Sequence, residues 1–192
     1  MAYAKSLEPD LIAVTMHWGA EYINVRQPLQ TEAAELLFSL GADLVLGGHP
    51  HVPQPMETRE IVAEDGSVRT GYLCYCLGNL VANMSEEKHP TSTLTALVQL
   101  DVEKDPVTGK TALLRAEYIP LVMFDQYRYW AMGDWRFRLL DLREVIADYE
   151  SGDDRGFLSE YMYRDLSSRL DSIRDIMGPE LVYAAETPEG DE

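Results

Sequence analysis

The order of apolar and polar residues along the chain predicts an alternation of strands and helices. Residues 10–16 form a short apolar run rich in β-branched side chains, which favours a buried strand. Residues 28–40 have helical periodicity. Their apolar side chains recur at positions 33, 36, 37 and 40. A second apolar run, residues 42–48, follows at once. A strand, a helix and a strand joined by short connections predict a βαβ unit with parallel strands.

The following segments predict hairpins and then helices. Residues 57–63 and 70–77 flank the turn signal Glu-Asp-Gly-Ser and read as a hairpin. Residues 92–123 contain two long strand patterns around Asp-Pro-Val-Thr-Gly-Lys, which predict another hairpin. Residues 134–150 and 157–177 are amphipathic at helical spacing. We therefore expect an α/β fold with added β-hairpins and a C-terminal helical hairpin.

The same pattern divides the chain into three parts. Residues 1–124 form the predicted α/β domain, and residues 125–182 form a predicted helical appendage. Residues 183–192 are acidic and close the chain, so we expect them to be disordered.

Histidines follow the ends of both predicted parallel strands. His17 comes directly after the first strand, and His49 and His51 follow the second in the motif Gly-Gly-His-Pro-His. Because ligands of open α/β sheets bind at the carboxyl ends of the strands, we expect the three rings to meet. Imidazole is a common metal ligand, and two histidines held apart by one rigid proline can face different metals of a pair. A loop with exposed histidines is the simpler alternative.

Composition narrows the classes of function. The chain has 192 residues and a formal net charge of −17, which argues against binding to nucleic acid or to anionic lipid. No apolar run approaches the roughly 20 residues that cross a bilayer, and the first residues lack a signal-peptide pattern. Cys74 and Cys76 lie two residues apart in a predicted strand, so we expect small hydrophobic side chains without a disulfide. Ser85 and Ser92 lack a Gly-x-Ser-x-Gly context, which disfavours a serine hydrolase.

Three motifs, taken in chain order, resemble a known family. They are VTMHWGAEY, GADLVLGGHPHVPQPME and YCLGNL. Together they resemble the bacterial CapA family, which is named for poly-γ-glutamate capsule biosynthesis and belongs to the calcineurin-like metallophosphoesterases. The similarity covers roughly residues 8 to 122. It implies the C-terminal half of a metallophosphoesterase sandwich and a site for two divalent metal ions, often manganese, iron or zinc.

The resemblance also implies roles for particular residues. By the family pattern, His17 and His49 bind one metal ion and His51 binds the other. Asn79 lines the pocket and, with His49, would take part in catalysis of metal-assisted hydrolysis. Trp18 and Glu21 would shape the rim of that pocket.

Other parts of the family pattern are missing. The segment before His17 does not match the family's early aspartate ligand, its bridging aspartate after a glycine or its Gly-Asn-His segment, and Leu80 stands in LGNL where the family has phenylalanine. Three histidines without bridging carboxylates leave the charge of two divalent ions uncompensated. We therefore expect a fragment that binds metal weakly or not at all and has little hydrolase activity alone. Its partners would be the missing N-terminal half of the domain, an anionic polymer or phosphoester substrate, and further copies of itself.

Two other interpretations stay open at this point. The chain can be a non-catalytic binding or assembly component that keeps the fold and part of the site. It can also be a plain α/β module whose histidines are loop residues. The parent protein would belong to the cell envelope by resemblance, while the sequence itself leaves the localisation unknown.

Overall fold

The computed structural model describes residues 1–62, 66–84, 86–129 and 136–183, which contain two β-sheets and four α-helices. The strands of the first sheet are β1 (Ala13–His17), β2 (Leu44–Gly48), β3 (Met56–Val62) and β4 (Val68–Cys74). Those of the second are β5 (Leu94–Lys104), β6 (Thr111–Asp125), β7 (Phe137–Asp141) and β8 (Leu181–Tyr183). The α-helices are α1 (Ala2–Ser6), α2 (Pro28–Ser39), α3 (Leu142–Ser151) and α4 (Glu160–Met177), and Gln126–Tyr129 form a short 3-10 helix.

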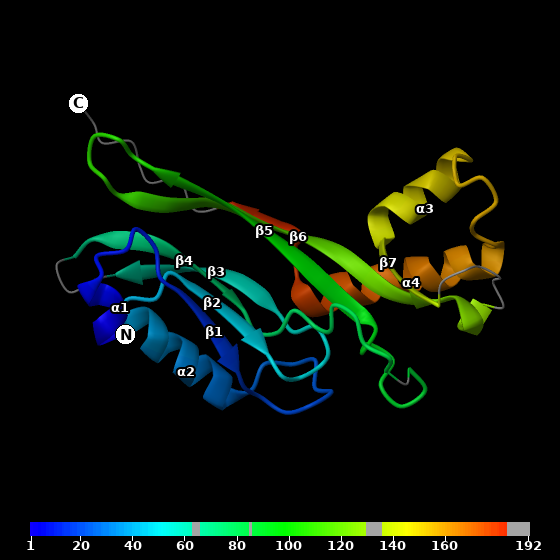
Figure 1. Cartoon of the computed structure of the whole chain (residues 1–192), viewed down its shortest axis with the longest axis horizontal. Coiled ribbons are helices and arrows are strands. Elements are labelled where there is room, and N and C mark those ends of the chain that lie inside the picture. Colours follow the sequence, from blue (N-terminus) through cyan, green and yellow to red (C-terminus); the bar gives the residue numbers. More distant parts are fainter. Residues whose placement is uncertain (63–65, 85, 130–135, 184–192) are drawn as a thin grey trace.

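The first sheet has the strand order β1-β2-β4-β3. β2 pairs in parallel with β1 and with β4, whereas β3 runs antiparallel to β4 at the sheet edge. This arrangement confirms the predicted βαβ unit and the predicted β3–β4 hairpin, although residues 63–65 of its turn lie outside the described residues. Figure 1 shows this sheet between α2 and the long β5–β6 hairpin. The protein is thus of mixed α/β class, as the pattern predicts.

Successive side chains along the strands of the first sheet point to opposite faces and pack into two separate cores. Val45 and Leu73 point toward α2, where they pack with the buried ring of Phe38. Their neighbours Leu44 and Tyr72 point the other way and join the core shared with the second sheet. Successive strand residues face opposite sides, so a sheet covered on both faces needs apolar residues at every position. That requirement explains the continuous apolar runs in the sequence.

The buried face of α2 differs from the predicted one. Gln30, Ala34 and Phe38 are buried, whereas Leu36 and Leu40 are exposed. The predicted stripe is therefore confirmed at Ala33 and Leu37, which pack against this core, and wrong at Leu36 and Leu40. The sheet selects a face that includes a buried glutamine, and hydrophobicity alone does not reveal that choice.

The second sheet is antiparallel and carries the C-terminal helices. β5 and β6 form the predicted hairpin, and β7 and β8 both pair with β6. Residues 137–141 form β7 rather than the start of a helix, which corrects the predicted helix over 134–150; residues 134 and 135 lie outside the described residues. α3 begins only after Asp141, whose side chain accepts hydrogen bonds from the first turn.

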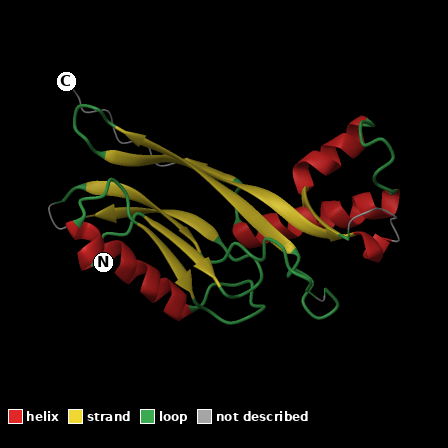
Figure 2. Cartoon of the chain, in the orientation of Figure 1, coloured by secondary structure: helices red, strands yellow, loops and turns green. Residues whose placement is uncertain are grey.

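One apolar core runs through the second sheet and both C-terminal helices. Leu166 and Ile173 of α4 are fully buried in the same cluster as Tyr118 of β6 and Tyr72 of β4. Figure 2 shows both helices beyond one end of the first sheet, beside the second. The division of the chain at residue 124 stays a prediction, and the predicted acidic tail lies, from residue 184 on, outside the described residues.

Both cysteines are buried, and neither forms a disulfide. Burial raises the pKa of the Cys74 thiol to about 12, because the thiolate would lose its hydration. Both side chains are thus buried packing groups without a disulfide, which confirms the prediction. In the described part of the chain, no helix combines the length and apolar character that a membrane crossing requires.

Phe38 and Leu36 provide a matched test of the observed face of α2. Phe38→Ala should lower the free energy of unfolding by about 3–5 kcal/mol, because it empties a buried site between α2 and the sheet. Leu36→Ala, at a side chain that is 58% exposed, should change it by no more than about 0.5 kcal/mol. Urea denaturation of both variants measures the difference, and equal losses would contradict the observed packing.

Candidate functional site

Parallel pairing of β1 with β2 brings two of the predicted ligands together. His17, the last residue of β1, lies opposite Gly48, the last residue of β2. His49 therefore leaves the sheet beside His17, and the two ring centroids are 4.4 Å apart. The carboxyl ends of two adjacent strands thus present a pair of imidazoles, as the strand pattern predicts.

His51 completes the group of converging rings and is held by Asn79. Its ring centroid lies 6.3 Å from that of His49. The amide nitrogen of Asn79 donates to the carbonyl oxygens of His51, at 2.9 Å, and Ser92, at 3.2 Å. The side-chain oxygen of Asn79 is then left to face Nδ1 of His51, 2.8 Å away.

That hydrogen bond fixes the tautomer of the neutral His51 ring. An amide oxygen accepts hydrogen bonds and cannot donate them, so the proton of the imidazole resides on Nδ1. Nε2 of His51 consequently keeps its lone pair, which is the form needed to bind a metal ion or to accept a proton. Asn79 therefore contacts a predicted metal ligand, and its place in a pocket stays a prediction.

The backbone around the histidines adopts conformations that are rare for side chains other than glycine. Among the described residues, five non-glycine residues have a positive φ, and three of these lie here. They are Tyr22 at 62°, His49 at 100° and His51 at 62°. Such conformations cost about 1–3 kcal/mol each and tend to gather at functional sites. Their concentration around the imidazoles supports a functional reading of this sheet edge.

Two aromatic residues that sequence reasoning missed also lie at this edge. The ring of Tyr22 lies 5.8 Å from that of His51 and stacks on that of His89 with centroids 3.5 Å apart. The backbone N–H of Tyr22 donates to the carbonyl of Pro50 at 2.7 Å, which ties the two loops together. Tyr22 ends the VTMHWGAEY motif, but no local signal in the sequence points to His89.

Two buried side-chain amides connect α2 to the loops after β1 and β2. Nε2 of Gln30 donates to Oε1 of Gln54 at 2.8 Å, and Nε2 of Gln54 donates to the carbonyl of Ile23 at 2.7 Å. Both glutamines are almost completely buried, so an unmade hydrogen bond here would be costly. The amides therefore fix α2 against the loops that carry Tyr22 and the histidines.

Trp18 is a structural residue and does not form the rim that the resemblance implies. Its side chain is only 9% exposed and packs in the core beneath α2, and its Nε1 donates to the carbonyl of Tyr75 at 2.8 Å. This hydrogen bond passes over Gly47, where an added Cβ would lie 1.8 Å from that carbonyl oxygen. The absence of a side chain at Gly47 thus leaves room for this hydrogen bond. Glu21 is exposed, and its role at the rim stays a prediction.

The donor set is rich in imidazole but incomplete for a metal centre. His17 is exposed, and His49 and His51 are partly buried, so all three lie at the surface of the sheet edge. Within the described ranges, however, no group of three or more histidine, cysteine or acidic side chains is arranged to hold a metal ion. The described residues therefore fit part of a metal site and not a closed one.

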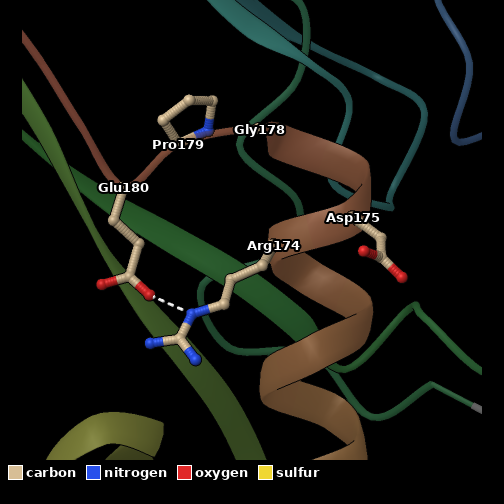
Figure 3. A pocket seen from close by; sticks show the side chains of 5 residues that line it. All are labelled: Arg174, Asp175, Gly178, Pro179 and Glu180. Atoms are coloured by element: carbon tan, nitrogen blue, oxygen red, sulfur yellow. Dashed lines mark hydrogen bonds and ion pairs between the residues drawn. The ribbon is translucent and has the colours of Figure 1, made fainter.

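A surface hollow lies elsewhere, at the C-terminal end of α4 (Figure 3). It has a volume of about 570 Å³ and is lined by Arg174, Asp175, Gly178, Pro179 and Glu180. The guanidinium of Arg174 pairs with Glu180, so its charge is already neutralised, and Asp175 points away from the pair. None of the histidines lines this hollow, and we place the candidate site at the histidine cluster.

Comparison with known proteins finds similarity over the segment that carries the histidines. The model of the family "Bacterial capsule synthesis protein PGA_cap" matches residues 2–84. The capsule biosynthesis protein CapA of Bacillus anthracis is 34% identical over 85 residues. The PGA biosynthesis protein CapA of Bacillus subtilis (strain 168) is 34% identical over 96 residues.

Residues 2–84 are a CapA-family region. The two alignments cover 44% and 50% of this chain but only 18% and 22% of those relatives, so the chain spans about a fifth of their length. The CapA-family region includes His17, His49, His51 and Asn79. His89 and the C-terminal helices lie beyond the residues that the family model matches.

Substitutions at Gly47 and Gly48 test the hydrogen bond from Trp18 to Tyr75 that passes over β2 in the CapA-family region. Gly47→Ala should destabilise the fold by about 1–3 kcal/mol or more, because the new methyl group meets the Trp18–Tyr75 hydrogen bond. Gly48→Ala should be tolerated, because the nearest atom to its Cβ would be 3.9 Å away. Chemical denaturation followed by tryptophan fluorescence measures the free energy of unfolding of both variants. A Gly47→Ala variant as stable as the unsubstituted chain would contradict the observed path of the Trp18–Tyr75 hydrogen bond.

Asn79 can be tested through the tautomer of His51. In metal-free protein in alkaline buffer, ¹⁵N spectra of the imidazoles should show His51 protonated on Nδ1. Asn79→Ala should remove that preference, whereas Asn83→Ala, at an exposed asparagine in the same loop, should retain it. An Nε2-protonated His51 in the unsubstituted chain would refute the assignment.

Proposed function

We propose that the CapA-family region carries the imidazole part of a divalent-metal site in a metal-assisted phosphoester hydrolase. By its likeness to the CapA proteins, this hydrolase would serve poly-γ-glutamate capsule synthesis on a calcineurin-like fold. One observation carries the proposal: His17 and His49 lie ring to ring, 4.4 Å apart, at the carboxyl ends of adjacent parallel strands. His51, with its Nε2 lone pair set by Asn79, lies beside them.

The chemistry of the donors indicates which ions the site would take. Imidazole nitrogen suits zinc and iron, and mixed sites with carboxylates also accept manganese. A bound divalent ion supplies Lewis-acid polarisation of a phosphoryl oxygen. In this proposal His17 and His49 bind the ion, and Asn79 orients His51 so that Nε2 can bind a second ion or take up a proton. His49 and Asn79 are the proposed catalytic groups: His49 as a ligand of the ion, and Asn79 through the ring of His51, which it orients.

Carboxylate ligands must come from outside the described residues of this chain. The proposed pair of ions needs negative charge, and the described acidic side chains do not join the histidines in a group. β1 is an edge strand of its sheet, and His17 at its end is exposed. A further half-domain lying along that edge would bring its own ligands next to His17. Without that half, the chain would bind metal weakly, act little on phosphoesters or anionic polymers, and tend to self-associate through the open edge.

A non-catalytic binding or assembly role is the second candidate. The observation in its favour is the incomplete donor set among the described residues. In that case the histidine cluster would keep its geometry without a tightly held ion. Metal titration of the chain mixed with the upstream half of a CapA protein would separate the two candidates, since only the hydrolase proposal expects a tight site to form.

Calorimetric titration of the chain alone with Zn²⁺ and with Mn²⁺ tests the imidazole site. We expect at most one weakly held ion per chain, and His17→Ala or His49→Ala should abolish its binding. Asn79→Ala should leave this ion bound, because the proposal assigns the ion to His17 and His49 and Asn79 orients only His51. Asn83→Ala, at an exposed asparagine that the proposal gives no role, is the control and should retain binding. Binding that survives both His17→Ala and His49→Ala would refute the proposed site.

A further inference from the structure

Residues 86–93 form a wall between the histidine cluster and helix α4. On the side of the cluster, the ring of His89 stacks on Tyr22 at 3.5 Å with an angle of 13° between the ring planes. Tyr22 in turn lies 5.8 Å from the ring of His51. The wall therefore reaches a predicted metal ligand through two aromatic contacts.

Two further hydrogen bonds tie the wall to the loops of the site. The hydroxyl of Thr91 donates to Oδ1 of Asn24 at 3.0 Å, and Nδ2 of Asn24 donates to the carbonyl of Pro53 at 2.9 Å. The carbonyl of Ser92 accepts from Asn79, the residue that sets the His51 tautomer. A displacement of the wall would thus be transmitted to both loops that carry the imidazoles.

On its other side, the wall is held by one arginine of α4. Nη1 and Nη2 of Arg169 each donate to a carboxylate oxygen of Glu86 at 2.9 Å, and Nη1 also donates to the hydroxyl of Thr93 at 3.0 Å. That hydroxyl donates to Glu86 at 2.5 Å. The side chains of Arg169 and Glu86 are 11% and 19% exposed. A bidentate ion pair with so little exposure to solvent is strong and fixes the relative orientation of the two side chains.

The same arginine is fixed on its own helix. Its Nε donates to Asp165 at 2.7 Å, and Asp165 also accepts a hydrogen bond from Tyr129. Arg128 pairs with Glu86 from the 3-10 helix but is more exposed than Arg169. The guanidinium of Arg169 is therefore a fixed point to which the wall is attached, and not a flexible surface charge.

We propose that Arg169 is a positioning residue of the histidine site, acting through Glu86 and Thr93 to hold the rings of His89 and Tyr22 against His51. α4 lies outside the residues that the capsule-synthesis family model matches, so this assigns a role in the site to the C-terminal part of the chain. The inference concerns ring positions in the metal-free protein, and only its effect on metal binding rests on the proposed function.

The test compares two arginines of the same helix. Arg169→Met keeps the aliphatic stem and removes the contact with Glu86, whereas Arg164→Met removes an exposed pair with Glu160 one turn earlier. The readout is the ¹H–¹³C spectrum of the histidine rings in chelator-treated protein. His89→Ala and His51→Ala variants assign the signals. Circular dichroism and dispersed core methyl signals report whether each variant is folded.

In the unsubstituted chain, stacking on Tyr22 should displace the His89 ring signals upfield of a free histidine. Arg169→Met should remove most of that displacement and shift the signals of His51, while Arg164→Met should leave both unchanged. Glu86→Gln removes the charge on the other side of the same contact, in residues 86–93, and leaves α4 unchanged. It should therefore reproduce the effect of Arg169→Met.

Unchanged His89 and His51 signals in folded Arg169→Met and Glu86→Gln would overturn the proposal. If Arg169→Met does not fold, Glu86→Gln decides alone. Global unfolding of both variants would also count against it, because the pair would then serve overall stability. The samples contain no metal, so a negative metal titration leaves this result unaffected, and the two proposals fail separately.

Discussion

The parallel register of β1 and β2 is the constraint on which the candidate site depends. It sets His17 opposite Gly48, so the next residue, His49, leaves the sheet beside the ring of His17. A slip of one residue would turn His17 to the other face of the sheet and separate the rings. The register is held by apolar contacts on both faces and by the hydrogen bond from Trp18 that passes over Gly47.

The candidate site is assembled from the carboxyl end of the first sheet and from the segment between β4 and β5. The end of β1 and the loop after β2 supply the imidazoles. The segment between β4 and β5 supports His51, because Asn79 holds the ring of His51 and is itself held by the carbonyl of Ser92. A hydrogen bond to a fixed amide therefore determines the orientation of the His51 ring. Such support is typical of residues that must present a lone pair in a defined direction.

Much of the fold could be predicted from periodicity, because strands covered on both faces leave continuous apolar runs and hairpins leave turn residues. The meeting of His17 with His49 and His51 was also predictable, since parallel strands align their carboxyl ends. β7 was not, because Phe137–Asp141 continue directly into α3 and their pairing with β6 is a long-range effect. The contact of Tyr22 with His89 joins residues that are 67 positions apart in the sequence and has no local signature.

The conformation of the Gly-Gly-His-Pro-His loop has a consequence for how the sequence can change over time. His49 and His51 both have left-handed backbone angles, at which a side chain costs roughly 1–2 kcal/mol and glycine is nearly free of strain. If only stability mattered, glycine would therefore be favoured at both positions. Both imidazoles thus stand at positions where folding alone would favour glycine.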